Sequence, residues 1–134
     1  MAVDPTQLVK DQLDPVLGLD PTIEAAIPRQ IEAQAALRGW AVGSMSQDAA
    51  VYVAILATKA MIPRLLVKFS LRVEEAKGGP AEAKYAKACD FLTALMKELE
   101  QQADAAAWNV DPSDYKPGSL LKPSYPKPDI KGFK

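Results

Sequence analysis

The 134-residue sequence predicts an all-α protein: a helical bundle of about four to five helices with kinks at prolines, followed by an extended, irregular C-terminal arm. Three observations predict this fold class. Apolar residues recur at helical spacing, helix start and stop signals separate the apolar segments, and prolines and lysines crowd the chain after Trp108. We therefore expect a helical bundle over residues 1–107 and an arm over residues 108–134.

The first two helices share a start signal, an aspartate followed by a proline. In Asp4-Pro5 and in Asp20-Pro21, a good N-cap residue precedes a proline at the first helical position. The first helix is expected to run to about Leu13, where Asp14-Pro15 and then Gly18 interrupt it.

The second helix carries a single apolar stripe, because apolar residues recur every four positions. The stripe consists of Ile23, Ile27, Ile31 and Ala35. Pro28 lies inside it and is expected to kink or divide the helix, because proline removes a backbone hydrogen bond and clashes with the preceding turn. Gly39 is suited to cap the C-terminal end.

The most apolar segment runs from Ala49 to Ile62. Its β-branched residues would also suit a buried strand, but the segment exceeds strand length, which favours a helix. A helix that is apolar on all sides is expected at the centre of a bundle or packed on two partners. Ser44 and Gln47 form a potential capping box before it, and Pro63 is expected to kink or restart it.

The last helix has the most regular pattern. Gly78-Gly79-Pro80 predicts a turn before it. Its apolar residues are spaced three and four apart, as in a coiled-coil seam, at Tyr85, Ala88, Leu92, Leu95 and Leu99. Cys89 flanks the seam and is interpreted as a buried structural thiol rather than a nucleophile.

Composition argues against several classes of function. The formal net charge is −1, so no overall basic field attracts nucleic acid. Histidine is absent, which removes the commonest general base and metal ligand. The longest strictly apolar run, Ala49 to Ala57, is far shorter than the about 20 residues that span a bilayer. The N-terminus has no positively charged and no apolar region typical of a secretory signal. We expect no catalytic residues, cofactor, metal or membrane association.

An enzyme that uses carboxylates such as Glu24 or Glu32 remains an alternative. It ranks last because no acid and base can be paired on one helix face.

A short basic stripe is one candidate contact site. Arg64, Lys68 and Arg72 follow one another at intervals of four residues, beside an apolar helix face. The stripe could contact DNA phosphates or an acidic partner. A solvated helix face is favoured, because Glu75 follows and no aromatic residue is interleaved for base stacking.

The C-terminal arm is the stronger candidate. Its prolines favour extended backbone, yet it retains hydrophobic residues that a solubilising tail would not need. These partner-binding candidates are Tyr115, Leu120, Leu121, Tyr125, Ile130 and Phe133. We expect the arm to dock on a neighbouring molecule.

The chain resembles the helical head-to-tail connector (adaptor) proteins of tailed bacteriophages. The resemblance rests on four segments: the apolar Asp48–Lys59 helix, the Phe69–Pro80 segment, the amphipathic Ala81–Glu100 helix and the long arm.

This resemblance implies a structural protein of the virion neck, assembled in the host cytoplasm. Such subunits form a ring under the portal and around the DNA channel. The implied partners are copies of the chain itself, the portal, and other neck or tail proteins. DNA would pass through without sequence-specific binding, and the arm over residues 108–134 would be the docking element. The alternative is a bacterial helical adaptor or regulatory protein that binds a partner through its arm or through the Arg64 stripe.

Overall fold

The computed structural model describes residues 4–110, and this part of the chain is all helical. Four α-helices follow one another as α1 (Pro5–Leu17), α2 (Thr22–Leu37), α3 (Gln47–Glu75) and α4 (Ala81–Asn109). A single turn of 3-10 helix, η1 (Val42–Ser44), lies between α2 and α3. No strand occurs in residues 4–110. The predicted all-α bundle is confirmed.

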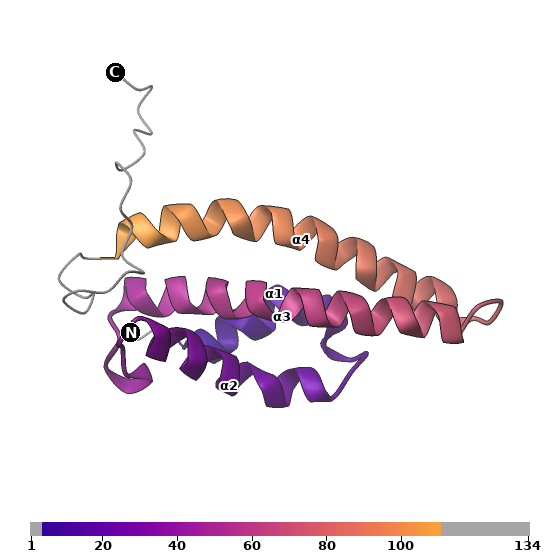
Figure 1. The fold of residues 1–134 in the computed structure, drawn as a ribbon, viewed down its shortest axis with the longest axis horizontal. Helices are drawn as coiled ribbons and strands as arrows, with labels where there is room; N and C mark the ends of the chain where they lie inside the picture. The colour runs from indigo at the N-terminus through magenta and orange to yellow at the C-terminus, as the bar shows by residue number, and fades with distance from the viewer. Residues whose placement is uncertain (1–3, 111–134) are drawn as a thin grey trace, which may run out of the picture.

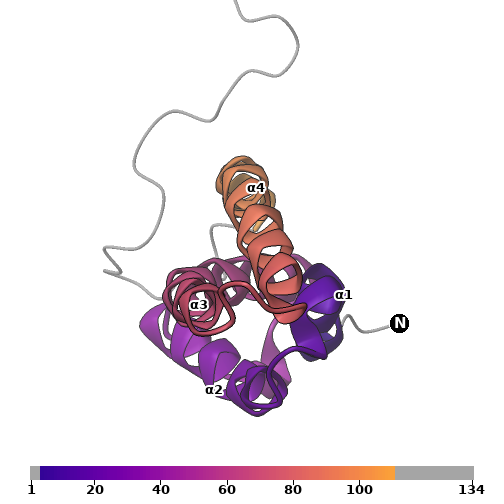
Figure 2. The ribbon, with the colours of Figure 1, turned by 90° about the vertical axis from the view of Figure 1, so that its right-hand side faces the viewer.

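The helices differ in length, which gives the bundle a projecting end. The two long helices, α3 and α4, form an antiparallel hairpin that runs the whole length of the molecule (Figure 1). The shorter α1 and α2 pack along one part of α3 and leave the hairpin tip beyond them (Figure 1). Seen end-on, the four helices surround a common core (Figure 2).

Helix α3 is the central element, because it contacts α1, α2 and α4. Its length and composition would also allow it to cross a membrane, with a mean hydropathy of 1.7 in its most apolar window. However, 56% of that window is buried inside the bundle. Its first half packs on several partners, so residues such as Val53 and Ala57 are fully buried. A central bundle position therefore accounts for the apolar sequence.

The core contains the residues that the two clearest patterns predicted. All four members of the α2 stripe are buried, and so are Ala88, Leu92, Leu95 and Leu99 of the α4 seam. Tyr85 at the head of the seam is only half-buried. Its ring stacks on Phe69 of α3, with 6.0 Å between the ring centroids, and this pair joins the two helices near the hairpin tip.

The prolines do not divide the helices. Pro15, Pro28 and Pro63 all lie within continuous helices. The expected interruption of the first helix after Leu13 is therefore wrong, because α1 continues to Leu17. Pro28 was expected to kink or divide its helix and Pro63 to kink or restart its helix, and neither helix is divided. All three prolines are exposed, so water can reach the carbonyl groups that lose their intrahelical donors.

The starts of α1 and α3 follow the sequence signals with one displacement. Asp4 accepts a hydrogen bond from the Thr6 amide at 3.0 Å and caps α1 as expected. The N-cap of α3 is Ser46, whose hydroxyl accepts from the Ala49 amide at 3.2 Å. The predicted box at Ser44 is therefore wrong, because Ser44 belongs to η1 and the cap lies two residues farther along the chain.

The C-terminal end of α2 confirms the role of Gly39. This glycine has a φ of 78°, a left-handed conformation that side chains with a Cβ rarely adopt. The Gly39 amide donates to the Ala36 carbonyl, and the Trp40 amide donates to the Ala35 carbonyl. This pair of bonds is a Schellman motif, and it turns the chain towards η1.

Candidate functional site

The predicted basic stripe does not form one uniform surface. Lys68 pairs with Asp20, and Arg72 approaches Glu75 on its own helix with 3.7 Å between Nη1 and Oε1. Arg64 has no ion-pair partner among residues 4–110. The helical spacing brought the three residues to one side of α3, but the neighbours of each residue differ. Only Arg64 keeps an unpaired charge among the three.

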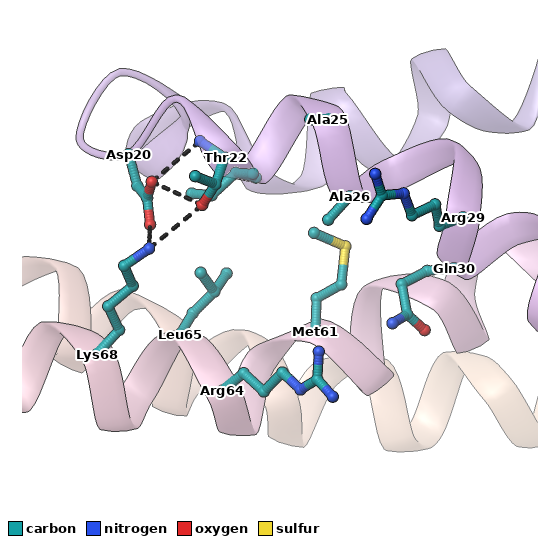
Figure 3. A pocket seen from close by; sticks show the side chains of 11 residues that line it. Asp20, Thr22, Ala25, Ala26, Arg29, Gln30, Met61, Arg64, Leu65 and Lys68 are labelled. Carbon is teal, nitrogen blue, oxygen red and sulfur yellow. Dashed lines mark hydrogen bonds and ion pairs between the residues drawn. The ribbon is translucent and has the colours of Figure 1, made fainter.

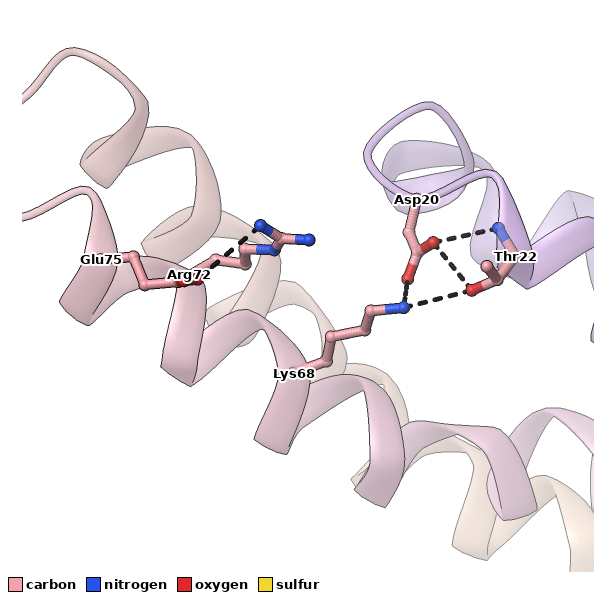
Figure 4. A network of polar contacts seen from close by, with 5 residues as sticks. All are labelled: Asp20, Thr22, Lys68, Arg72 and Glu75. Atoms are coloured by element: carbon pink, nitrogen blue, oxygen red, sulfur yellow. Dashed lines mark hydrogen bonds and ion pairs between the residues drawn. The ribbon is translucent and has the colours of Figure 1, made fainter.

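Lys68 belongs to a polar network at the start of α2 (Figure 4). The Lys68 ammonium forms an ion pair with Oδ2 of Asp20 and donates to the Thr22 hydroxyl at 3.2 Å. The other carboxylate oxygen of Asp20 accepts from the Thr22 amide at 3.0 Å and from the Thr22 hydroxyl at 2.7 Å. Asp20 thus accepts from the first amide of α2 and fastens the start of α2 to α3, although the N-cap of α2 is Pro21, one residue later than the sequence signal predicted.

The network lowers the pKa of Asp20. Burial by itself raises the pKa of this carboxyl group, because the residue is only 5% exposed. The Lys68 ammonium and the two Thr22 donors stabilise the carboxylate by more than burial destabilises it. The net result is a pKa below the ordinary value of 3.8. Asp20 is therefore a charged structural residue at neutral pH.

A groove extends from this network between α2 and α3 (Figure 3). Its volume is about 470 Å³. Apolar side chains, chiefly Met61 and Leu65 of α3 and Ala26 of α2, form much of its lining. The polar lining residues are Asp20, Thr22, Arg29, Gln30, Arg64 and Lys68. We call this hollow the arginine groove.

Two arginines give the groove its charge. Arg29 comes from α2 and Arg64 from α3, and they lie on either side of the Met61 side chain (Figure 3). Both side chains are exposed, and neither has an ion-pair partner within residues 4–110. Lys68 at the end of the groove is neutralised by Asp20. The groove thus combines an apolar floor with two uncompensated guanidinium groups, which suits a ligand that carries apolar groups and a carboxylate.

A second surface lies farther along α3, towards its C-terminal end. Val67 and Leu71 are 64% and 60% exposed, although they are large apolar residues. Glu74 follows at the next position of the same face and is exposed, with no side-chain partner among the residues described. The spacing of four and three residues places the three side chains in one row. We call this row the α3 ridge.

The carboxylates of the enzyme alternative do not gather into a site. Glu24 and Glu32 are both exposed on α2. Neither lines the arginine groove, nor the two smaller hollows beside Trp40 and beside Phe91. In residues 4–110, no three Asp, Glu, His or Cys side chains come close enough together to hold a metal ion.

The remaining candidates divide into those inside and those outside the described part of the chain. Cys89 is half-buried rather than fully buried, and its Sγ lies 3.9 Å from the Ser70 hydroxyl. Gly78-Gly79-Pro80 forms the predicted turn between α3 and α4. Helix α4 continues to Asn109, two residues past the expected end of the bundle. The six hydrophobic residues expected to anchor the arm lie outside residues 4–110.

Sequence reasoning missed most of this site. Arg29 carried no pattern of its own, and its meeting with Arg64 depends on how α2 lies against α3. One signal was available for the ridge. Val67 and Leu71 are spaced four residues apart, and they do not fall on the same face as Leu65 and Phe69, which the core requires. Two large apolar residues off the core face indicate a surface that is available for contact.

Comparisons with protein-family models, with curated proteins and with solved structures find no match to this chain.

Proposed function

We propose that this protein is a structural connector, a helical subunit that assembles with copies of itself by protein–protein contact. In its most specific form, the proposal is a ring in the neck of a tailed phage, under the portal and around the DNA channel. The resemblance of the Asp48–Lys59 and Ala81–Glu100 helices to phage connector proteins supports this form. The all-α bundle with a long hairpin is compatible with it.

One observation carries the proposal: α3 presents two unlike surfaces side by side. The arginine groove is a positively charged hollow, and the α3 ridge is an apolar row that ends in a carboxylate. A closed ring is built from heterologous contacts, in which one patch meets a different patch on the next subunit. A subunit that works alone needs neither surface, whereas a ring subunit needs both.

The charge distribution along the chain supports a separate role for the arm. Residues 111–134 contain five lysines and three aspartates, whereas residues 1–110 contain eleven basic and fourteen acidic residues. The arm is therefore positive and the rest of the chain negative. An arm of this charge suits an acidic surface on a neighbour or on the portal.

Mass measurement in solution tests the proposal. We expect the full-length protein to form a closed oligomer, alone or when mixed with a portal protein, as measured by sedimentation velocity and native mass spectrometry. A protein that stays monomeric from micromolar to millimolar concentration in both settings would contradict it. The alternative, a bacterial helical adaptor, predicts a monomer that binds one partner without forming a ring.

Removal of the arm gives a second test. We expect deletion of residues 113–134 to leave the helical circular dichroism signal of the bundle intact, because the described core is built from residues up to Val110. Assembly should fail, since the resemblance assigns docking to the arm. Undiminished assembly of the truncated protein would refute the docking role of the arm.

A further inference from the structure

We propose that the arginine groove of one copy receives the α3 ridge of the next copy, with Glu74 of the ridge paired to Arg64 and Arg29 of the groove. This contact rests on the proposed assembly into a ring and names the surfaces that make it. The occupant of the groove is thus a second copy of the chain.

The ridge has the chemistry that the groove requires. Val67 and Leu71 present apolar side chains, and Glu74 presents a carboxylate on the same helix face. The groove offers Met61 and Leu65 to the apolar groups and two guanidinium groups to the acid. A guanidinium group binds a carboxylate through a planar pair of hydrogen bonds, which fixes the orientation of the ridge in the groove.

The geometry allows one copy to use both surfaces at once. Met61, Leu65 and Lys68 of the groove lie roughly a third of a turn of α3 away from the ridge, whereas Arg64 stands in the same row as the ridge, one turn before Val67. The ridge lies towards the hairpin tip, which projects beyond α1 and α2 (Figure 1). The groove lies farther back, between α2 and α3. A projecting ridge and a recessed groove make a heterologous contact, in which each copy donates one surface and offers the other.

Charge favours the α3 ridge of a second copy over two other possible occupants of the groove, the C-terminal arm and nucleic acid. The arm carries more lysines than aspartates, so two arginines would repel it. Nucleic acid requires a broader basic surface, and here Asp20 neutralises Lys68 while Glu75 lies beside Arg72. Glu74, in contrast, is an acid without a partner among the described residues and lies directly beside exposed apolar side chains.

Charge reversal with complementation tests the contact in the full-length protein. Arg64→Glu and Glu74→Arg each place like charges together in every contact, and we expect each variant alone to associate about tenfold or more weakly than wild type. Both positions are exposed, so circular dichroism should show unchanged helical content.

An equimolar mixture of the two variants should recover association. When the variants alternate, the acid introduced at position 64 of one copy meets the base introduced at position 74 of the next. At the other contact, the unchanged Arg64 of the second variant meets the unchanged Glu74 of the first. Positions 64 and 74 then carry opposite charges at every contact, while the unchanged Arg29 still meets the introduced base at one of the two contacts, so we expect recovery that is substantial but incomplete. Loss of association in both variants without recovery on mixing would overturn the inference.

Matched controls on α4 carry the same charge changes away from both surfaces. Lys97→Glu and Glu100→Arg alter exposed residues with no side-chain partner among those described, and we expect both to associate like wild type. Assembly that tolerates Arg64→Glu and Glu74→Arg, but fails when residues 113–134 are removed, would assign the contact to the arm and overturn this inference alone. A wild-type protein that never associates would overturn the proposed function together with the contact.

Discussion

Asp20 shows how one residue can stabilise the start of one helix and also join it to another. Its carboxylate accepts from the Thr22 amide at the start of α2 and pairs with Lys68 of α3. The hydrogen bond to Thr22 is local and of the kind that the Asp20-Pro21 signal predicted, although α2 begins at Thr22 and its N-cap is Pro21. The ion pair joins residues that are 48 positions apart, and the sequence contains no pattern that would reveal it.

Replacement of Asp20 should therefore destabilise the bundle. We expect Asp20→Ala to lower the free energy of unfolding by about 1–3 kcal/mol, mainly through loss of its hydrogen bonds to Thr22 at the start of α2. The side chain of Lys68 is 40% exposed, so it can turn to solvent once its partner is gone and adds little to the loss. Urea unfolding followed by circular dichroism measures the effect. Asp14→Ala, at an exposed α1 position, is the control and should change stability little.

The lowered pKa of Asp20 also predicts a dependence on pH. The folded state binds the proton of this group less readily than the unfolded state, so the network stabilises the fold above the unfolded pKa. The stabilisation should be lost as the pH falls below 3.8 towards the lower folded pKa. The difference in unfolding free energy between wild type and Asp20→Asn should therefore be constant near neutral pH and shrink in acid. A difference that grows in acid would contradict the assignment.

The three residues of the basic stripe mark the limit of prediction at this scale. Arg64, Lys68 and Arg72 were equivalent by spacing, but their surroundings made them different. Lys68 meets an acid from the connection between α1 and α2, Arg72 meets an acid from its own helix, and Arg64 faces an open groove. Spacing predicts which residues share a helix face. It does not predict which charges find partners across helices.

At the scale of helices, the sequence predicted which helices form better than it predicted where each one begins and ends. The α2 stripe and the α4 seam located their helices because tertiary packing and local periodicity agree there. The interruption expected after Leu13 was wrong, and the possible division at Pro28 and restart at Pro63 do not occur, for a physical reason. A proline in a helix interior costs about 3 kcal/mol in isolation, but each of these helices buries an apolar face while its proline stays exposed. Packing outweighs the local preference.

Two glycines differ in backbone conformation but have equal room for a side chain. Comparing them tests whether the α3–α4 turn requires a left-handed residue. A Cβ added at Gly78 or at Gly18 would meet no atom within 4 Å. Gly78 has a φ of 82°, whereas Gly18 has a φ of −75°. We expect Gly78→Ala to destabilise the protein by about 1 kcal/mol, because left-handed backbone strains a residue with a Cβ.

Gly18→Ala is the matched control for this turn. It should be neutral or stabilising by up to about 1 kcal/mol, because alanine restricts the unfolded chain without straining the folded one. Thermal unfolding of both variants measures the contrast. Equal effects of the two substitutions would show that the turn does not depend on the left-handed conformation of Gly78.

At the scale of the whole molecule, α3 serves as core and as surface in different parts of its length. Its first half is surrounded by other helices, and its second half keeps Val67 and Leu71 exposed. The sequence predicted a central helix from the apolar run. The groove and the ridge required the relative placement of α2, α3 and the hairpin tip, which no local pattern encodes.

The proposed contact combines apolar burial with ion pairing. Measuring association at different salt concentrations distinguishes the two contributions. Raising the salt concentration screens the exposed pairing of Glu74 with the arginines, so wild-type association should weaken with salt but persist.

Arg64→Gln should weaken association at low salt and reduce its salt dependence. Leu71→Ser should weaken association by about tenfold at every salt concentration, because burial of a leucine side chain contributes about 1.5–3 kcal/mol and Leu71 is 60% exposed in the single copy. Sedimentation equilibrium at low and high salt measures both variants. Salt-independent association of the wild type, or a Leu71→Ser variant that assembles normally, would contradict a contact built from the ridge and the groove.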